Sequence, residues 1–394
     1  MAETIEFRNI KIVTETKTMS SARIQVKDGK ITAVSEDFIG EADTVIDGQG
    51  KQWTLIPGFI DVHIHGADGH DVMDASYDAL EGMASRLPEE GTTSFLATTM
   101  TQSKENISRA VQTVGTYINQ QKANSQAEVL GIHLEGPFIS QEKAGAQPLE
   151  HICMPSIKQF DQWQAESDHY IRLVTLAPEV SNGMEFIKHV SQSGVVASIG
   201  HSQATYDQVT EAVRSGARHI THLYNQMSGL HHREPGIVGG AFLNKELMVE
   251  MIVDHVHSRP EMIQLAYQHT QADRTILITD AMRAKCLPEG TYDLGGQNVN
   301  VVGNEARLAD GTLAGSILTL EQAVSNMSQD KMITIEDLVR ITSTNAATQL
   351  GIEDRKGSIA EGKDADLVIL DEEYGVVMTV CRGVVAHDRR EETP

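Results

Sequence analysis

The chain has 394 residues and a net charge of −23 at pH 7, which allows one large domain with a small one, or two to three average domains. Such an acidic chain argues against nucleic acid and anionic membranes as partners, since both require a basic face, so an anionic substrate must be held by a few local cations. The three cysteines are odd in number without a C-x-x-C motif, the first residues resemble no secretory leader, and no run of about 18 apolar residues could span a bilayer. We therefore expect a cytoplasmic protein without disulfides.

The first 55 residues or so consist of short strand-like runs with no helical pattern among them. Two of these runs, 22–26 and 31–34, flank Lys27-Asp28-Gly29-Lys30, where the Asp-Gly pair predicts a tight β-hairpin turn. This part of the chain therefore predicts a small antiparallel sheet.

From residue 56 onward, apolar runs alternate with helical patterns, which predicts βα units and a parallel sheet. Eight runs cover residues 59–65, 92–98, 129–135, 171–177, 195–200, 218–222, 248–254 and 275–280. The gaps leave room for helices, for example at 104–122, 182–193 and 204–215. Eight such units predict a closed, TIM-like (β/α)₈ barrel. A doubly wound open sheet remains the alternative, because spacing alone does not exclude it.

After the eighth run, the sequence predicts two helices and then a return to short strands. The helices begin at the capping residues Thr319 and Thr334, and strand-like runs follow at 365–370, 376–380 and 383–385. We predict that residues 1–55 and 357–394 form one small β domain, and that residues 56–356 form the barrel inserted between them.

Candidate metal ligands and acids stand at the ends of the runs, where barrel enzymes carry their active sites. His63 and His65 lie two residues apart in the first run, so their side chains project to the same side of a strand. Further candidates are Glu135 at the end of the third run, His201 after the fifth, His222 at the end of the sixth, His257 after the seventh and Asp280 at the end of the eighth. One such residue alone is more often structural than a ligand, but this aligned set predicts a metal site.

Other histidines leave alternatives open. His133 has the same parity as Glu135 on its run and could compete as a ligand, whereas His219 has the wrong parity to point with His222. The histidines without a partner pattern are interpreted as surface or satisfied core residues: His70, His151, His169, His189, His269 and His387.

Imidazole and carboxylate ligands without thiolate suit Zn²⁺ or Fe²⁺ in a hydrolytic role. A metal site that is open to water activates that water at neutral pH. Asp280 would then take the proton of the water and return it to a leaving group. A further metal ligand is the alternative interpretation of Asp280, and the two roles can coexist.

A basic loop in this acidic chain indicates what is hydrolysed. The loop His231-His232-Arg233-Glu234-Pro235-Gly236 follows the sixth run, and an arginine can bind a phosphate through two parallel hydrogen bonds. An ordinary surface loop with an Arg–Glu pair is the alternative. Asn225 and Gln226 place amides next to His222, and these could hold sugar hydroxyls.

These stretches together resemble the N-acetylglucosamine-6-phosphate deacetylases of the metal-dependent amidohydrolase superfamily. The matching stretches run in family order from about residue 50 to 370 and are residues 57–66, His133-Leu134-Glu135-Gly136-Pro137-Phe138, Gly200-His201-Ser202, Thr221-His222-Leu223-Tyr224-Asn225, Arg233-Glu234-Pro235-Gly236, Thr279-Asp280-Ala281-Met282 and Leu313-Ala314-Gly315-Ser316. The resemblance implies a (β/α)₈ barrel with a small β-sandwich domain formed by both chain ends. It also implies hydrolysis of the sugar acetamide to glucosamine 6-phosphate and acetate, in amino-sugar catabolism.

Residue by residue, the resemblance implies that Glu135, His201 and His222 bind the main metal and that Asp280 is the catalytic acid/base. The substrate contacts that it implies are Ala146, Gln147, Asn225, Gln226, Arg233, His257, Leu313, Ala314 and Gly315. In relatives the arginine loop reaches the site of a neighbouring subunit, which implies a homodimer with Arg233 acting across the interface.

Two positions depart from part of the family. Some members lack histidines at the positions of His63 and His65 and hold one metal, so this chain could bind one or two, with Glu135 in the bridging place. Gln147 stands where some relatives have a histidine that contacts the substrate, and an amide cannot carry charge. Two rival functions remain: another amidohydrolase reaction, such as that of a deaminase or cyclic amidase, and a metal-free barrel that acts only as an interaction protein.

Overall fold

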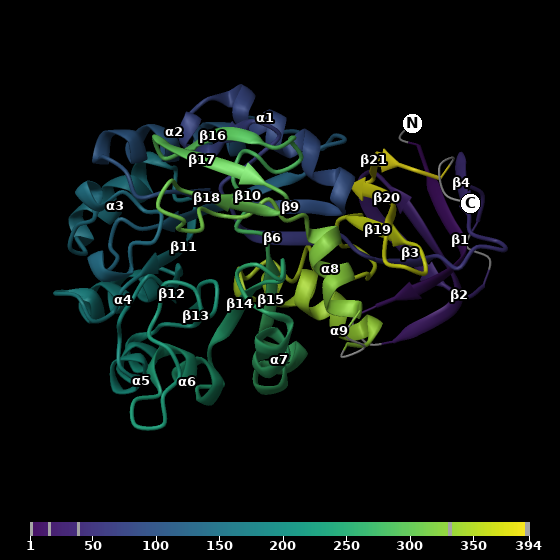
Figure 1. Cartoon of the computed structure of the whole chain (residues 1–394). Coiled ribbons are helices and arrows are strands. Elements are labelled where there is room, and N and C mark those ends of the chain that lie inside the picture. Colours follow the sequence, from purple (N-terminus) through teal and green to yellow (C-terminus); the bar gives the residue numbers. More distant parts are fainter. Residues whose placement is uncertain (1–2, 15–16, 38–39, 330–332, 391–394) are drawn as a thin grey trace.

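The computed structural model describes residues 3–14, 17–37, 40–329 and 333–390. Figure 1 shows a barrel surrounded by helices on one side of the molecule and a second sheet on the other side, with both chain ends beside that second sheet. A small three-stranded sheet lies over the barrel.

Eight parallel strands form the barrel wall in the order β6, β9, β10, β11, β12, β13, β14 and β15. Their bounds are β6 Phe59–Ile64, β9 Thr92–Thr99, β10 Glu128–Glu135, β11 Ile171–Leu176, β12 Val196–Ile199, β13 His219–Ile220, β14 Met248–Ile252 and β15 Thr275–Ile278. The chain after β15 returns to β6, since the amide of Asp280 donates to the carbonyl of His63 at 2.8 Å and Ala281 bridges to Ile64. This closure confirms the predicted barrel over the open sheet.

Each barrel strand is followed by a helix on the outside. The helices are α1 Tyr77–Arg86, α2 Lys104–Gln120, α3 Ile157–Glu166, α4 Gly183–Gln192, α5 Tyr206–Ser215, α6 Gly236–Leu243, α7 Pro260–Arg274 and α8 Leu320–Gln329. The hydroxyls of Ser103 and Thr205 accept hydrogen bonds from the first turns of α2 and α5, which explains where these helices begin. The helices predicted at 104–122, 182–193 and 204–215 are thus confirmed within about two residues at each end.

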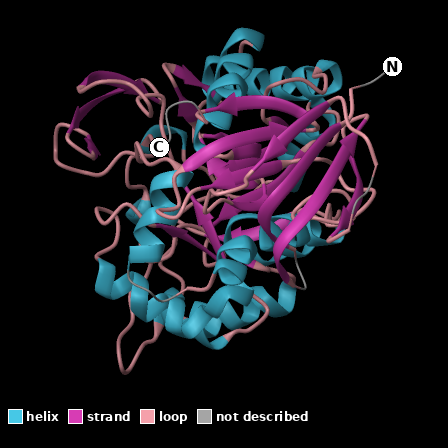
Figure 2. Ribbon diagram, turned by 90° about the vertical axis from the view of Figure 1, so that its right-hand side faces the viewer, coloured by secondary structure: helices cyan, strands magenta, loops and turns pink. Residues whose placement is uncertain are grey.

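The second sheet combines strands from both ends of the chain (Figure 2). Its strands are β1 Ile5–Val13, β2 Thr18–Lys27, β3 Lys30–Ser35, β4 Thr44–Asp47, β5 Thr54–Pro57, β19 Leu367–Leu370, β20 Val376–Cys381 and β21 Val384–Asp388. β19 pairs with β5, which joins the two ends, and the sheet has a hydrophobic core of its own. The predicted hairpin is confirmed: Lys27 pairs with Lys30, and Asp28 and Gly29 both have positive φ, as a type I′ turn requires. The domain boundaries at 55/56 and 356/357 stay a prediction.

Two small sheets lie outside the barrel wall, and the sequence analysis did not predict them. They are the hairpin β7 Gly66–Ala67 with β8 His70–Asp71, and the three-stranded sheet β16 Gly290–Leu294, β17 Gln297–Val302 and β18 Glu305–Arg307. The amide of Gln102 donates to the carbonyl of Gly295 at 3.0 Å, and that of Gln297 to the carbonyl of Ala146 at 2.7 Å. These bonds hold the three-stranded sheet against loops at the barrel mouth.

The helical segment predicted from Thr334 to Leu350 is interrupted by one wider turn. It consists of α9 Ile335–Val339, a π-helical turn Arg340–Thr344 and α10 Asn345–Gln349. Within the turn, the hydroxyl of Ser343 donates to the carbonyl of Gly58 at 3.0 Å, which ties this segment to the start of β6. The short 3₁₀ helices are Val72–Asp74, Leu87–Glu90, Gln141–Lys143 and Leu149–His151. Among the helices of the described ranges, none combines the length and the apolar character that a membrane span needs.

Candidate metal centre and active site

The candidate ligands converge at the carboxyl ends of the barrel strands. His63 lies near the end of β6 and His65 directly follows it, while Glu135 is the last residue of β10. His201, His222 and Asp280 each occupy the second position after a strand, namely β12, β13 and β15. The sequence prediction that these side chains share one edge agrees with this placement.

His201, His222 and Asp280 share an unusual backbone conformation. Their φ angles are 46°, 31° and 49°, in the left-handed region that residues other than glycine rarely adopt. Each such residue costs on the order of 1–3 kcal/mol and persists only where the surrounding structure enforces it, typically at functional sites. The same strained turn after three different strands aims three side chains into the barrel mouth.

Glu135, His201 and His222 form a tight triplet. The Nε2 atoms of His201 and His222 lie 3.3 Å and 3.2 Å from Glu135 Oε1, and 3.1 Å from each other. All three side chains are buried. Two imidazole nitrogens and one carboxylate oxygen thus surround a single point.

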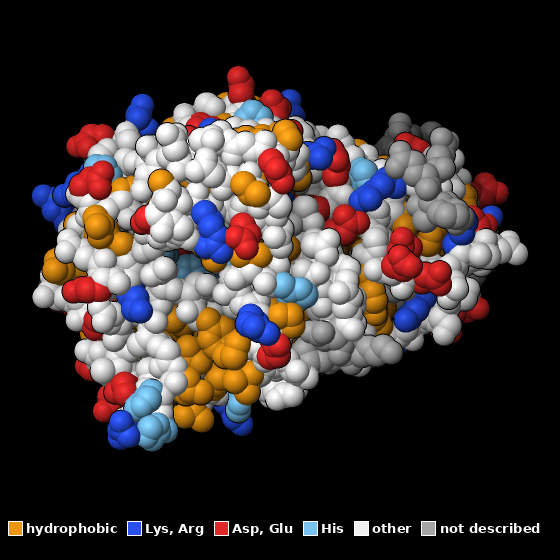
Figure 3. Space-filling view, in the orientation of Figure 1, with side chains coloured by type: hydrophobic (Ala, Val, Ile, Leu, Met, Phe, Trp, Pro, Cys, Tyr) orange, Lys and Arg blue, Asp and Glu red, His pale blue; other side chains and the backbone are white. Residues whose placement is uncertain are grey.

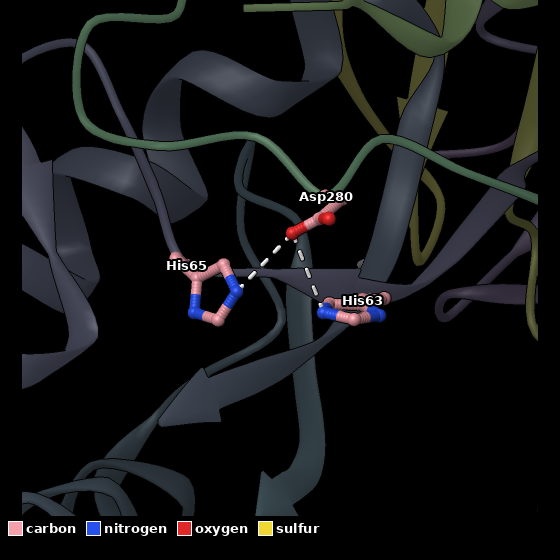
Figure 4. Close-up of side chains that lie close together, drawn as sticks. All are labelled: His63, His65 and Asp280. Atoms are coloured by element: carbon pink, nitrogen blue, oxygen red, sulfur yellow. Dashed lines mark ion pairs between the residues drawn. The ribbon is translucent and has the colours of Figure 1, made fainter. Parts of the chain in front are cut away.

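A second triplet consists of His63, His65 and Asp280. Figure 4 shows both imidazole rings directed at the Asp280 carboxylate. The Nε2 atoms of His63 and His65 lie 3.4 Å and 3.2 Å from Asp280 Oδ1. The two histidines of the first run therefore point the same way, as their spacing predicts.

Glu135 connects the two triplets. Its Oε1 atom lies 3.3 Å from His63 Nε2, while its Oε2 atom lies 3.3 Å from His65 Nε2. Each oxygen of one carboxylate thus faces a nitrogen of the second triplet, and Oε1 also faces both histidines of the first. This is the arrangement that a carboxylate between two cations would take.

The donor set fits a divalent metal. Within the described residues, the buried atoms His63 Nε2 and Glu135 Oε1 have no hydrogen-bond partner. Adjacent ligand atoms of a tetrahedral zinc site with bonds of about 2.0–2.1 Å are about 3.3–3.4 Å apart, close to the separations seen here. With the imidazoles neutral, the buried carboxylates of Glu135, Asp280 and Glu250 leave negative charge that a cation would balance.

Glu250, in β14, supports the site from behind. Its Oε2 atom lies 3.0 Å from His63 Nδ1 and accepts from the backbone amide of His222, also at 3.0 Å. Its Oε1 atom lies 3.0 Å from His219 Nε2. One buried carboxylate thus orients His63 and the backbone that carries His222.

The structure also places the two histidines that the sequence left open, and one of them, His133, forms a further candidate metal-binding group with His63 and Glu250. His219 points at Glu250, away from the triplets, as its parity predicted. His133 lies beside His63, with ring centroids 4.5 Å apart, but its Nε2 atom bonds with the Thr175 hydroxyl at 2.7 Å. His133 therefore packs behind the site, where a hydroxyl satisfies it.

Burial and charge act in opposite directions on the ionisable groups of the site. Burial disfavours the charged form of His63, but the carboxylates of Asp280, Glu135 and Glu250 outweigh it and raise its pKa well above the ordinary value. Burial likewise opposes ionisation of Glu135, yet His63, His201 and His222 hold its pKa well below the ordinary range. The site therefore keeps its carboxylates ionised and favours positive charge between them.

The candidate metal donors open into a cavity of about 340 Å³. This volume lies within the range of about 300–1,000 Å³ that is typical of small-ligand sites. The lining residues are His65, Met100, Glu135, Gly145, Ala146, Gln147, His201, His222, Asn225, Gln226, His257, Asp280, Leu294, Arg307, Thr312, Leu313 and Gly315. Nine of these seventeen residues carry an amide, an imidazole or a carboxylate, which suits a polar ligand.

Comparison with known proteins assigns the family. The amidohydrolase family pattern matches residues 54–386, which is most of the chain. The chain belongs to the amidohydrolase family.

Individual relatives of this amidohydrolase match it over nearly its whole length. It is 46% identical over 392 residues to an N-acetylglucosamine-6-phosphate deacetylase of Bacillus subtilis (strain 168), with 99% of each chain covered. It is 36% identical to an N-acetylgalactosamine-6-phosphate deacetylase of Escherichia coli O157:H7, with 95% of this chain and 97% of the relative covered. The crystallised deacetylase of Mycobacterium smegmatis, a mutant in complex with N-acetyl-D-glucosamine-6-phosphate, superposes with a TM-score of 0.91 at 29% identity, covering 98% and 99% of the two chains.

Most of the substrate contacts expected from the sequence line the cavity of this amidohydrolase. They are Ala146, Gln147, Asn225, Gln226, His257, Leu313 and Gly315. Ala314 is buried next to them but does not line the cavity. Arg233 does not line it either: its side chain is exposed and pairs with His232 Nε2 at 2.7 Å.

Gln147 links the end of β10 to the loop that follows β9. Its Nε2 atom donates to Glu135 Oε2 at 2.8 Å, and its Oε1 atom accepts from the backbone amide of Thr101 at 2.8 Å. Its amide therefore helps to orient Glu135, while its side chain still borders the cavity.

Sequence reasoning missed two charged residues of the site. Glu250 was visible as a carboxylate inside the seventh apolar run, where a buried charge requires a partner. Arg307 carried no comparable signal, because it follows the eighth run in a segment for which no element was predicted.

Proposed function

We propose that this amidohydrolase hydrolyses N-acetylglucosamine 6-phosphate to glucosamine 6-phosphate and acetate. The observation that carries the proposal is the group of Glu135, four histidines and Asp280 at the base of a polar cavity. The relative from Bacillus subtilis and the Mycobacterium smegmatis enzyme with its bound sugar phosphate support this choice of substrate over that of a deaminase or cyclic amidase.

Glu135, His201 and His222 would hold one divalent metal, Zn²⁺ or Fe²⁺, and His63 with His65 would hold a second one on the other side of Glu135. Such a metal lowers the pKa of water and polarises an amide carbonyl. The chain's own contribution is orientation: Glu250 fixes His63, the carbonyl of Lys143 lies 2.8 Å from His201 Nδ1, and Gln147 fixes Glu135.

Asp280 would transfer the proton that the reaction moves. Its carboxylate takes a proton from the attacking water, whose oxygen forms a bond to the carbonyl carbon of the acetamide. The same group then delivers that proton to the amide nitrogen as the carbon–nitrogen bond breaks. The products are acetate and the amine of the sugar, which takes up the second proton of the water and leaves as an ammonium group, while Asp280 returns to its ionised form. Its position at 3.2 Å from His65 and on the cavity wall places it next to both steps.

The remaining lining residues would position the sugar. Asn225 and Gln226 offer amide groups for hydroxyls, and His257 offers an imidazole whose Nδ1 atom is held by Asp254 Oδ2 at 2.6 Å. The segment from Leu313 to Gly315 and the loop at Ala146 border the same cavity. The reaction would thus take place at the end of the cavity that holds the metal ligands and Asp280, while the other lining residues bind the sugar.

We further propose a homodimer in which Arg233 reaches the cavity of the partner subunit. Arg233 lies outside its own cavity, so a phosphate contact by this residue requires a second copy. Three exposed apolar side chains lie near the loop of Arg233: Leu230 on the loop before α6, Leu243 at the end of α6 and Met262 on α7. Figure 3 shows a hydrophobic patch over this part of the molecule, with histidine and basic side chains beside it. The cytoplasmic location expected from the sequence stays a prediction.

Metal analysis and a substrate series test the proposal. Purified protein should contain one or two divalent metal ions per subunit and release acetate from N-acetylglucosamine 6-phosphate far faster than from the unphosphorylated sugar. The galactosamine epimer belongs in the series because a relative of that name is 36% identical. A protein without metal and without acetate release would instead support the interaction-protein alternative.

A further inference from the structure

The cavity of a single chain contains one permanent positive charge. Among the described residues that line it, Arg307 is the only lysine or arginine. The chain as a whole carries a net charge of −23, so a generally basic surface does not explain why Arg307 lies at the cavity. A dianionic phosphate needs such a group, because histidine is only partly charged at neutral pH.

The guanidinium group of Arg307 is oriented by its own hairpin. Its Nε atom donates to Glu305 Oε2 at 2.6 Å and its Nη1 atom to the carbonyl of Gly311 at 2.7 Å. Among the described residues, Nη2 has no hydrogen-bond partner. The planar group is therefore held in place with donors still available, which is the condition for binding an anion at low entropic cost.

The position of Arg307 over the cavity is also fixed. Arg307 ends β18 and bridges to Leu313, which lines the same cavity. The sheet that carries it is fastened to the barrel mouth through Gln102 and Gln297. Arg307 thus belongs to the wall of the cavity.

His257 lines the same cavity as Arg307 and Asp280. Burial disfavours a charge on His257, but Asp254 outweighs burial and raises its pKa, while the charge of Arg307 acts against this rise. The carboxylate of Asp280 also acts on His257. His257 therefore lies within electrostatic reach of both the candidate acid/base and Arg307.

We propose that Arg307 is a specificity-determining residue that binds the phosphate of the substrate from within the same chain, with His257 beside it. This inference rests on the proposed deacetylation and deepens it. The cavity would recognise a sugar phosphate even before a partner subunit adds Arg233.

Replacing Arg307 by methionine tests the proposal. Arg307→Met keeps an unbranched side chain but removes the fork, and should raise KM for the phosphorylated sugar by roughly ten- to a hundredfold with little change in kcat. The rate on the unphosphorylated sugar should stay the same. Arg307→Lys keeps the charge and should recover part of the loss. Equal loss on both substrates overturns the proposal.

Arg8 provides a matched control. Its side chain is 36% exposed, against 40% for Arg307, and its Nε atom also donates to a carboxylate, that of Asp47, but in the second sheet. Calorimetric titration of the metal-loaded protein with inorganic phosphate should show binding that Arg307→Met weakens at least tenfold and Arg8→Met leaves unchanged. This measurement needs no turnover, so it stays readable if the proposed reaction is wrong. Equal phosphate affinity in wild type and Arg307→Met, or no measurable binding to wild type at millimolar phosphate, would overturn the role of Arg307.

Subunit mixing separates this residue from Arg233. Arg307 and Asp280 line the same cavity of one chain, so mixed dimers of Arg307→Met with Asp280→Asn contain no intact site. At low substrate concentration, the activity of the mixture should equal the sum of the activities that the same amounts of the two parent variants show separately. Activity clearly above that sum would show that Arg307 acts on the partner's site and would refute its assignment within the chain.

Discussion

At the scale of single residues, the proposed reaction depends on which side chain carries the proton and which side chains bind the metal. Asp280 is the only carboxylate of the second triplet, and it also borders the cavity. Asp280→Asn keeps the size and one oxygen of the side chain but cannot shuttle a proton. Since general acid–base catalysis contributes about 10²–10⁴ in rate, kcat should fall by at least that factor while most of the metal is retained. Steady-state kinetics with metal analysis checks this, and near-normal turnover with full metal would move the proton transfer elsewhere, with His257 as the next residue to examine.

The two triplets make separate predictions about metal content. Glu135, His201 and His222 match the ligand set that the resemblance implies for one-metal and two-metal relatives alike, whereas His63 and His65 belong to the second triplet. Replacing His63 and His65 together by alanine should therefore reduce a content of two ions to about one per subunit, while replacing His201 and His222 should reduce it further. Elemental analysis of the purified variants measures the stoichiometry. An unchanged content after the first double replacement would show that the opening pair is not a ligand pair.

The sequence was sufficient for the residues at strand ends and insufficient for those held by tertiary contacts. His63, His65, Glu135, His201, His222 and Asp280 are predictable because strand parity and the carboxyl ends of a barrel decide where they point. Arg307 reaches the cavity only because its hairpin folds back over the mouth. The contact of Gln147 with Glu135 depends equally on a loop conformation. No local pattern encodes either contact.

At the scale of elements, long buried runs were predictable and short exposed strands were not. All eight barrel strands lie within or near the predicted runs, although β13 is reduced to His219–Ile220. The strand β17 alternates buried and exposed residues over only a few positions, and β16 buries only its last residue, so neither strand produces an apolar run. The barrel follows from hydrophobic patterning, while the sheet over its mouth depends on contacts with the barrel.

β10 carries the candidate metal ligand Glu135 at its end and an ion cluster around Glu128 at its start. Burial opposes ionisation of Glu128, but Lys356 and Arg355 outweigh it and lower its pKa to about 2. The distances from Glu128 Oε2 are 2.8 Å to Lys356 Nζ and 2.9 Å to Arg355 Nη1. This cluster joins the barrel to the segment that leads into the second sheet.

The depressed pKa of Glu128 predicts how stability depends on pH. The contribution of the ionised carboxylate is fully present above its ordinary pKa of 4.5 and is lost as the pH falls toward about 2. Glu128→Gln should therefore lower the free energy of unfolding by about 2–3 kcal/mol at pH 7 and by roughly half as much near pH 3, where Glu128 is still mostly ionised in the folded state. Urea unfolding at both pH values measures the difference. The same destabilisation at both would mean that packing, and not the ion cluster, accounts for the effect.

At the scale of the whole molecule, charge and assembly are connected. The net charge of −23 keeps the surface acidic, so phosphate recognition must come from single cations placed at the cavity. Arg307 is such a cation within one chain, whereas Arg233 lies on an exposed loop next to apolar side chains. In the proposed symmetric dimer, Arg233 would reach the partner's cavity and complete the phosphate site.

The proposed dimer leads to a prediction that would not hold for a monomer. Arg233→Ala removes a charge-assisted contact worth about 1.5–3 kcal/mol, so KM for the phosphorylated sugar should rise roughly ten- to a hundredfold, with little effect on the unphosphorylated sugar. In dimers reassembled from equal amounts of Arg233→Ala and Asp280→Asn, each mixed dimer has one site with both Asp280 and a partner's Arg233. Random pairing makes half of the dimers mixed, so about a quarter of all sites should regain normal KM and turnover. Mixtures that show only the sum of the two parents would place Arg233 outside the partner's site and leave phosphate recognition to the residues of a single chain.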